Sequence, residues 1–175
     1  MSLLVAIAAG ALIGCSHDPT PAERAQGDLL DGGIQSDSLV GVDDAVIGED
    51  FWVALPVPSN KSSQPLEVTG AKFLNVPQGA KLVGYGAYTL EETDGLALLT
   101  RRGDSGMPDF DKLKNHLDEV IQVPGKSASE TYYVAHVKIT GPMNANFHGC
   151  KFDYQQGSRK YTQTVNCEAS LRLAK

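Results

Sequence analysis

The sequence predicts an all-β fold, an immunoglobulin-like antiparallel β-sandwich of seven or eight strands with at most one short helix. Short segments in which apolar and polar residues alternate recur along the chain, as expected for strands with one buried face. Residues that favour turns separate these segments at close spacing. Strands do not alternate with helices, which argues against a parallel α/β sheet. We expect the sandwich to occupy residues 47–175.

The N-terminal segment has the features of an export signal. Residues 2–14 are apolar and rich in Ala and Leu, and they lead into Leu12-Ile13-Gly14-Cys15. About a dozen apolar residues are too few to span a bilayer as an ordinary helix, but they suit the core of a signal peptide. The last four residues resemble the lipobox of bacterial lipoproteins, although no Lys or Arg precedes the apolar core.

The lipobox resemblance implies a lipoprotein signal peptide over residues 1–14, cleavage by the lipoprotein signal peptidase, and a lipid on Cys15. The protein would then be anchored to the extracytoplasmic face of the cell membrane. Ordinary secretion is one alternative, and a buried helix with a chance cysteine is another.

Residues 15–46 are predicted to form a flexible acidic tether. This stretch is rich in Asp, Gly, Ser and Pro, and its few apolar residues show no sustained period. Such a composition buries too little apolar surface to offset the entropy of ordering. The acidic residues of the stretch are Asp18, Glu23, Asp28, Asp31, Asp37, Asp43 and Asp44.

The first strands of the sandwich follow one another closely. Residues 51–55 carry a strong apolar load and end at Pro56, and residues 66–76 form the next strand region. A compact turn at 77–79 leads into a strand at 81–88, and a short buried strand is expected at 96–100.

An irregular, charged segment interrupts this rhythm at Arg101 to Leu117. Its second part, Asp109 to Leu117, is predicted to be a short helix because Phe110, Leu113 and Leu117 fall at helical spacing. The β pattern returns at 120–123 and again at 131–140, where apolar residues alternate.

The C-terminal stretch, Phe147 to Leu173, predicts a β-hairpin. From Tyr161 onward the odd positions are mostly apolar and the even positions are polar. The predicted register sets Cys150 opposite Cys167, with a loop centred near residues 158–159. Facing cysteines lie within disulfide range. Because disulfides persist in oxidising compartments, an exported protein would use Cys150 and Cys167 for a bridge and Cys15 for lipid.

In layout, the domain also resembles uncharacterised immunoglobulin-like exported proteins and lipoproteins of actinobacteria. The residues that carry the resemblance are Pro56-Val57, Pro65-Leu66 and Val76-Pro77-Gln78-Gly79. It implies no catalytic residues. The order of Cys, Trp and Cys found in true immunoglobulin domains is absent, because Trp52 precedes both hairpin cysteines.

Composition and motifs argue against several classes of function. A net charge of −6, with scattered basic residues, gives no electrostatic basis for binding nucleic acid. The chain has no Gly-x-Ser-x-Gly motif and no serine with an evident His and Asp, so we predict that it is not an enzyme. It also has no phosphate-binding glycine loop or dinucleotide fingerprint, so no cofactor is predicted.

The sequence is best interpreted as a non-catalytic interaction module at the cell surface, with a protein partner. Long irregular loops are often functional, so the candidate interaction loop comprises Arg101, Arg102, Asp104, Asp109, Phe110 and Asp111. The alternative is a lipoprotein that handles copper or zinc through His136 and His148, together with the nearby methionines Met107 and Met143.

Overall fold

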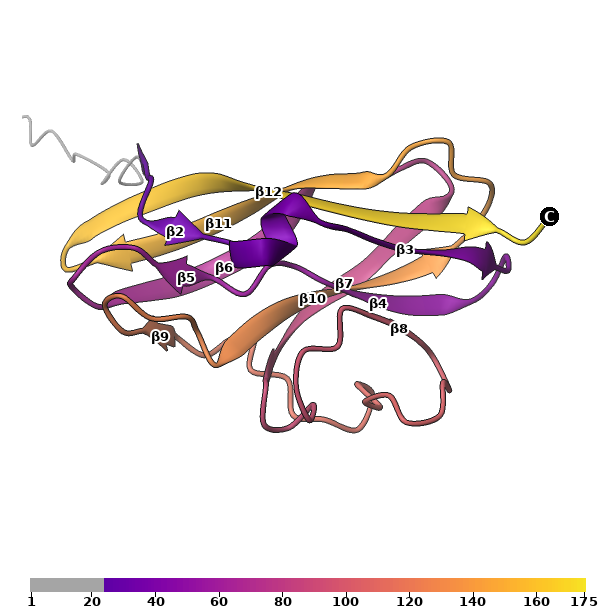
Figure 1. Cartoon of the computed structure of the whole chain (residues 1–175), viewed down its shortest axis with the longest axis horizontal. Helices are drawn as coiled ribbons and strands as arrows, with labels where there is room; N and C mark the ends of the chain where they lie inside the picture. Colours follow the sequence, from indigo (N-terminus) through magenta and orange to yellow (C-terminus); the bar gives the residue numbers. More distant parts are fainter. Residues whose placement is uncertain (1–23) are drawn as a thin grey trace, which may run out of the picture.

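Strands with one apolar face pair into two sheets that pack against each other (Figure 1). The computed structural model describes residues 24–175. The first sheet runs in the order β1 (Ala25–Gln26), β12 (Arg159–Leu173), β11 (Phe147–Gln156), β6 (Leu66–Asn75) and β9 (Ile121–Val123), with β3 (Leu39–Ala45) also on β12. The second sheet runs in the order β7 (Ala80–Thr89), β10 (Thr131–Ile139), β4 (Asp50–Ala54) and β8 (Leu99–Arg101). A small third sheet pairs β2 (Leu30–Asp31) with β5 (Ser59–Asn60).

The topology confirms the predicted immunoglobulin-like sandwich. In chain order, β4, β6, β7, β10, β11 and β12 take the places of strands B to G, because β4–β10–β7 are neighbours in one sheet and β6–β11–β12 in the other. At one edge of the first sheet, β1 and β3 both pair with β12 in parallel. No helix of the described residues is long and apolar enough to cross a membrane.

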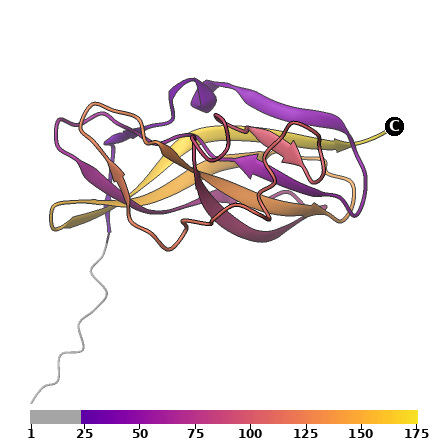
Figure 2. The same cartoon turned by 90° about the horizontal axis from the view of Figure 1, so that it is seen from below.

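The segment before β4 is folded, so the predicted tether is wrong for residues 24–45. It contains β1, β2, a 3₁₀ helix η1 (Gly33–Asp37) and β3, and it buries Leu30 and Ala45 in the core. Figure 2 shows it running along the sandwich. The physical reason is that edge strands gain backbone hydrogen bonds from β12 without needing a strong apolar pattern. Residues 1–23, with the predicted signal peptide and Cys15, lie outside the described residues.

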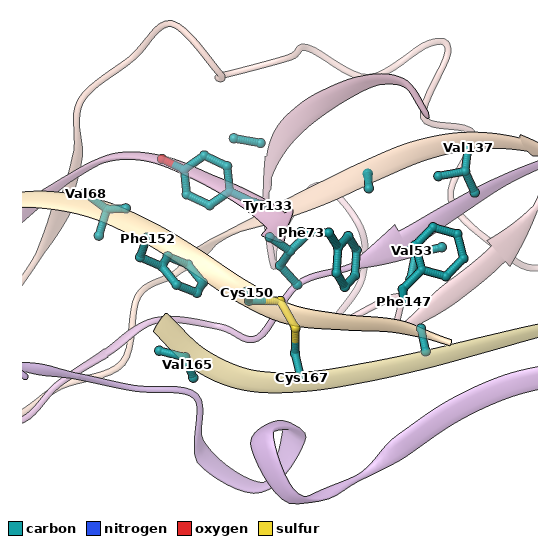
Figure 3. Packing of buried hydrophobic residues seen from close by; sticks show 14 of the residues in the cluster. Val53, Val68, Phe73, Tyr133, Val137, Phe147, Cys150, Phe152, Val165 and Cys167 are labelled. Carbon is teal, nitrogen blue, oxygen red and sulfur yellow. A yellow bond between two sulfur atoms is a disulfide. The ribbon is translucent and has the colours of Figure 1, made fainter. Parts of the chain in front are cut away.

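The main core fills the space between the sheets. Val53 and Tyr133 from the second sheet meet Phe73 and Phe152 from the first (Figure 3). Phe51 of the second sheet belongs to the same cluster. Each of these side chains is almost fully buried, and each such burial stabilises the fold by roughly 1.5–3 kcal/mol. The alternating residues of β4, β10 and β11 therefore hold the two sheets together.

The C-terminal hairpin forms as predicted, but its register differs. Gln156 pairs with Arg159, so the loop is only Gly157-Ser158, and Gly157 has the positive φ (58°) that a type II′ turn requires at this position. Cys150 consequently lies opposite Val165 rather than Cys167.

The predicted disulfide is present despite this shift. A bulge beside Gly149 changes the register between His148 and Cys150, which brings Cys167 diagonally across from Cys150. The two Cα atoms are 5.8 Å apart and the sulfur atoms are bonded (Figure 3). Both cysteines are buried beside the main core, so the bridge ties the last two strands together from the inside.

The insertion between β7 and β9 packs over the outer face of the second sheet. The predicted helix at 109–117 is wrong, because these residues form turns instead. Phe110 is buried in a second apolar cluster against Trp52 and Tyr88, with ring centroids 5.6 and 4.7 Å away. Packing of Phe110 on the aromatic outer face of the sheet thus stabilises turns in this segment in place of a regular helix.

Candidate functional site

An apolar groove opens at one side of the sandwich, between the η1–β3 segment and β4. It encloses about 180 Å³. Its base includes Phe73 and Cys167, which belong to the main core. Its mouth carries three large apolar side chains with high exposure: Ile34 at 86%, Leu39 at 58% and Leu98 at 40%. Apolar side chains that converge around one hollow are typical of interaction sites.

The wall of the groove is fixed by side-chain hydrogen bonds to both sheets. Val57 N–H donates to Gln35 Oε1 at 2.9 Å, which joins η1 to the chain after β4. Gln163 of β12 accepts from Leu30 N–H at 2.9 Å and donates to Leu30 O at 2.7 Å. These bonds hold the segment in place, and a preformed wall lowers the entropy cost of binding.

Gly32 allows the close approach that shapes this wall. A Cβ atom at this position would lie 2.8 Å from Pro56 Cβ and 2.9 Å from Val165 Cγ1, both closer than carbon atoms can pack. The backbone of the η1 turn can therefore come up against Pro56, which itself lines the groove. Ile34, two residues later, is left pointing away from the core, since 86% of it is exposed.

The size of the groove limits what it can hold. Sites for drug-sized molecules usually enclose about 300–1,000 Å³, so a space of about 180 Å³ is too small for most such ligands. It suits one or two aliphatic side chains of a larger partner. Interfaces between proteins commonly use such sockets for an anchoring residue.

The surroundings of the groove are acidic. Among residues 24–175, Glu168 is the only charged residue that lines it. Asp37 ends η1 beside the groove, and Asp31 accepts a hydrogen bond from Gly33 N–H at 2.7 Å just before Ile34. The chain from Ala25 to Asn60 contains no Lys, Arg or His. An approaching partner therefore meets a negative potential at this site.

Most charged side chains of the predicted interaction loop form ion pairs within the protein. Arg102 lies 2.9 Å from Asp111 and 3.5 Å from Asp50, and its guanidinium stands 5.3 Å from the Trp52 ring centroid. Arg101 bonds to Asp44 at 2.6 Å.

The remaining residues of the predicted loop are also engaged. Asp104 accepts a hydrogen bond from Arg101 N–H. A hydrogen bond from Lys112, 2.8 Å away, lowers the pKa of Asp109. Phe110 is buried and cannot contact a partner. The loop is thus assembled on the sheet, and its role in binding remains a prediction.

The two histidines of the metal hypothesis lie on different sheets. His136 of β10 bonds through Nε2 to Asp50 Oδ1 at 2.9 Å and stacks on Trp52, with centroids 4.7 Å apart. His148 of β11 lies beside Asn75, with the Asn75 side-chain nitrogen 3.2 Å from its Nδ1. Each faces outward from its own sheet, so the two cannot share an ion. Among residues 24–175, no group of three His, Cys, Asp or Glu side chains is placed to hold a metal.

A third histidine, which the sequence reasoning did not assign, forms a polar clamp. His116 Nδ1 lies 2.9 Å from Glu119, and its Nε2 lies 3.1 Å from Glu92. Hydrogen bonds that His116 donates to the two carboxylates raise the pKa of His116. The bonds from His116 and Thr89 lower the pKa of Glu92 to about 2. The clamp joins the two ends of the insertion.

The groove was also missed from the sequence. Ile34 is an isolated apolar residue and Leu39 begins a short apolar run within an acidic stretch, and Leu98 lies about sixty residues away from them in the chain. The available signal was the presence of large apolar residues in a polar segment.

Comparisons with known proteins identify no relative of this chain. No family model, curated protein or solved structure matches it. The resemblances to bacterial lipoproteins and to actinobacterial exported proteins remain predictions.

Proposed function

We propose that this protein is a non-catalytic binding module of the cell envelope that holds a protein partner through the apolar groove. The observation that carries this proposal is the exposure of Ile34, Leu39 and Leu98 around a hollow that reaches the core. Covering apolar surface stabilises a complex by roughly 2.5 kcal/mol for every 100 Å² buried, before the cost of association. A partner that covers a preformed socket with an apolar rim therefore gains the most binding free energy from this surface.

The disulfide supports the location outside the cytoplasm. A bridge such as Cys150–Cys167 persists in oxidising compartments and is rare where thiols are kept reduced. It agrees with the export signal expected from residues 1–14. The proposal therefore keeps the lipid on Cys15, which would anchor the domain through its N-terminus. The metal-handling alternative lacks comparable support, because His136 and His148 belong to separate sheets.

Selection from a random peptide library tests the groove as the binding site. The library is displayed on phage and selected on the immobilised domain, residues 24–175, in which both sheets are complete. Selected clones are then measured against wild type, a Leu39→Ser/Leu98→Ser variant, and a matched Ile47→Ser/Val120→Ser variant. The control pair is similarly exposed but does not line the groove.

The expected result is loss of binding to the groove variant alone, by about tenfold or more for two lost apolar contacts. Clones that bind all three proteins equally, or a library that yields no enriched clone, would overturn the proposal. Thermal unfolding of the two variants checks that both remain folded.

A further inference from the structure

The charges around the apolar groove have one sign. Glu168 lines the hollow, and Asp37 and Asp31 stand on the turn that carries Ile34. Seven of the 21 acidic residues of the chain, and none of its 15 basic ones, lie between Ala25 and Asn60, the segment that forms much of the groove. Asp31 and Asp37 are exposed. Their charges therefore act on whatever approaches the mouth.

No basic side chain of the neighbouring strand offsets this charge at the groove. Arg101 at the end of β8 is held away by Asp44 at 2.6 Å and by Glu49 at 3.6 Å. It is therefore already paired within the described residues. Like charges that face one another across an interface cost free energy, whereas opposite charges speed association and select the partner. The field at the groove thus favours a cationic partner.

We propose that the groove binds a basic polypeptide segment, with one aliphatic side chain in the socket and Lys or Arg residues next to it. This inference rests on the proposed function and names the chemistry of its partner. The volume of about 180 Å³ limits the size of the apolar side chain that the groove can hold. The carboxylates of Glu168, Asp37 and Asp31 favour positive charge in the residues next to that side chain. A second copy of this chain is disfavoured, because it would bring a net charge of −6 and the same acidic rim.

Three short synthetic peptides test separately whether binding needs the apolar anchor and whether it needs the flanking basic residues. The first carries a single leucine flanked on each side by two lysines. The second has glutamates in place of the lysines, and the third has serine in place of the leucine. Fluorescently labelled peptides are titrated with the domain, residues 24–175, at low and at high salt. Only the first peptide is expected to bind, and its affinity is expected to fall as salt screens the exposed charges.

Two double variants locate the charge effect. Asp37→Asn/Glu168→Gln neutralises the rim while keeping the size of each side chain, and glutamine retains an acceptor for the Glu168–Asn146 hydrogen bond. Glu91→Gln/Asp118→Asn makes the same change on the insertion, away from the groove. The rim variant is expected to weaken binding of the lysine peptide by about 2- to 30-fold, the range for two exposed ion pairs. The control is expected to leave it unchanged.

The outcomes distinguish this inference from the proposed function. If the glutamate peptide binds as well as the lysine peptide, and both need Leu39 and Leu98, the groove is a binding site but the basic partner is wrong. If the lysine peptide binds without needing Leu39 or Leu98, the groove assignment fails and this inference fails with it. Sedimentation that shows a dimer lost in the Leu39→Ser/Leu98→Ser variant would assign the groove to a second copy and overturn the inference.

Discussion

Gln163 and Leu30 are joined by two hydrogen bonds across 133 residues of sequence: Leu30 N–H donates to Gln163 Oε1, and Gln163 Nε2 donates to Leu30 O. Both residues are buried. The side-chain amide of Gln163 on β12 therefore satisfies the backbone N–H and C=O groups of Leu30 in the segment beside it. This pair explains why a stretch with the composition of a linker becomes part of the sandwich and one wall of the groove.

Replacing Gln163 should release that segment. Gln163→Ala leaves Leu30 N–H and O without partners, and each buried unsatisfied group costs about 1–3 kcal/mol. We expect the free energy of unfolding to fall by about 2–6 kcal/mol, and proteases to cleave within residues 24–45 sooner. Urea unfolding and limited proteolysis measure both effects. The exposed Gln122→Ala serves as control; an equal effect in both variants would contradict the assignment.

The disulfide should contribute measurably to stability. Replacing both cysteines, Cys150→Ala/Cys167→Ala, removes a bridge that closes a loop with a sequence separation of 17 residues. The chain-entropy model gives about 3 kcal/mol for a loop of this size. Denaturant unfolding of the variant, and of wild type with and without reductant, should show this loss. No difference between oxidised and reduced wild type would mean that the bridge adds nothing to stability.

The His116 clamp predicts a pH window for the insertion. The pKa of His116 is raised in the folded protein. The stability that His116 contributes to the fold is therefore fully present below its ordinary pKa of 6.5 and is lost as pH rises through the raised value. The pKa of Glu92 is lowered from 4.5 to about 2. The stability that Glu92 contributes to the fold is therefore fully present above pH 4.5 and is lost as pH falls toward 2. Protection of the insertion against hydrogen exchange, measured relative to the intrinsic rate at each pH, should be greatest between these limits.

A His116→Gln variant tests this clamp. It should abolish the loss of protection at alkaline pH in residues 90–120 and leave the protection of β11 and β12 unchanged. A loss of protection of the same size in the variant would show that another group controls the insertion.

Phe110 should act as the anchor of the insertion. Truncating a buried Phe commonly costs about 3–5 kcal/mol, so Phe110→Ala is expected to lower the melting temperature. It should also expose Trp52, the only tryptophan of the chain, and shift its fluorescence to the red. Leu117→Ala, at a more exposed position of the same insertion, is the control. Deleting residues 103–111 is for the same reason expected to destabilise the domain; an unchanged melting temperature would contradict this role.

Lipidation of Cys15 can be tested on the full chain. In a bacterial host that processes lipoproteins, we expect the mature protein to begin at Cys15, to carry acyl chains and to fractionate with membranes. Cys15→Ser should abolish both the added mass and the membrane association. Intact mass spectrometry of the two proteins decides the matter, and an unmodified wild-type cysteine would rule out the anchor.

The sequence predicted those features that depend on side-chain alternation. The odd positions from Gln163 to Leu171 are buried as the pattern of the last strand required, and the sandwich class follows from such strands. The pairing of Cys150 with Cys167 was also predictable, because the two share a face. Their exact register was not, since a local bulge beside Gly149 and a two-residue loop shift it without changing which residues are apolar.

The features that the sequence did not predict depend on contacts between distant segments. β3 is held by backbone pairing with β12 and carries only Val40, Val42 and the small Ala45 toward the core. The helical spacing of Phe110 and Leu113 is satisfied equally by turns that place both on an aromatic sheet face. The groove requires Ile34, Leu39 and Leu98 to meet, which only the tertiary fold achieves.

The parallel pairing of β3 with β12 has a mechanical consequence. The two strands run in the same direction, from Leu39 beside Glu168 to Ala45 beside Leu173. Tension between an N-terminal anchor and the C-terminal end would pull them past each other lengthwise and load their hydrogen bonds together. An antiparallel pair pulled from adjacent ends would instead open one bond at a time. The first and last long strands thus form a clasp that resists stretching along the axis on which a tethered domain would be pulled.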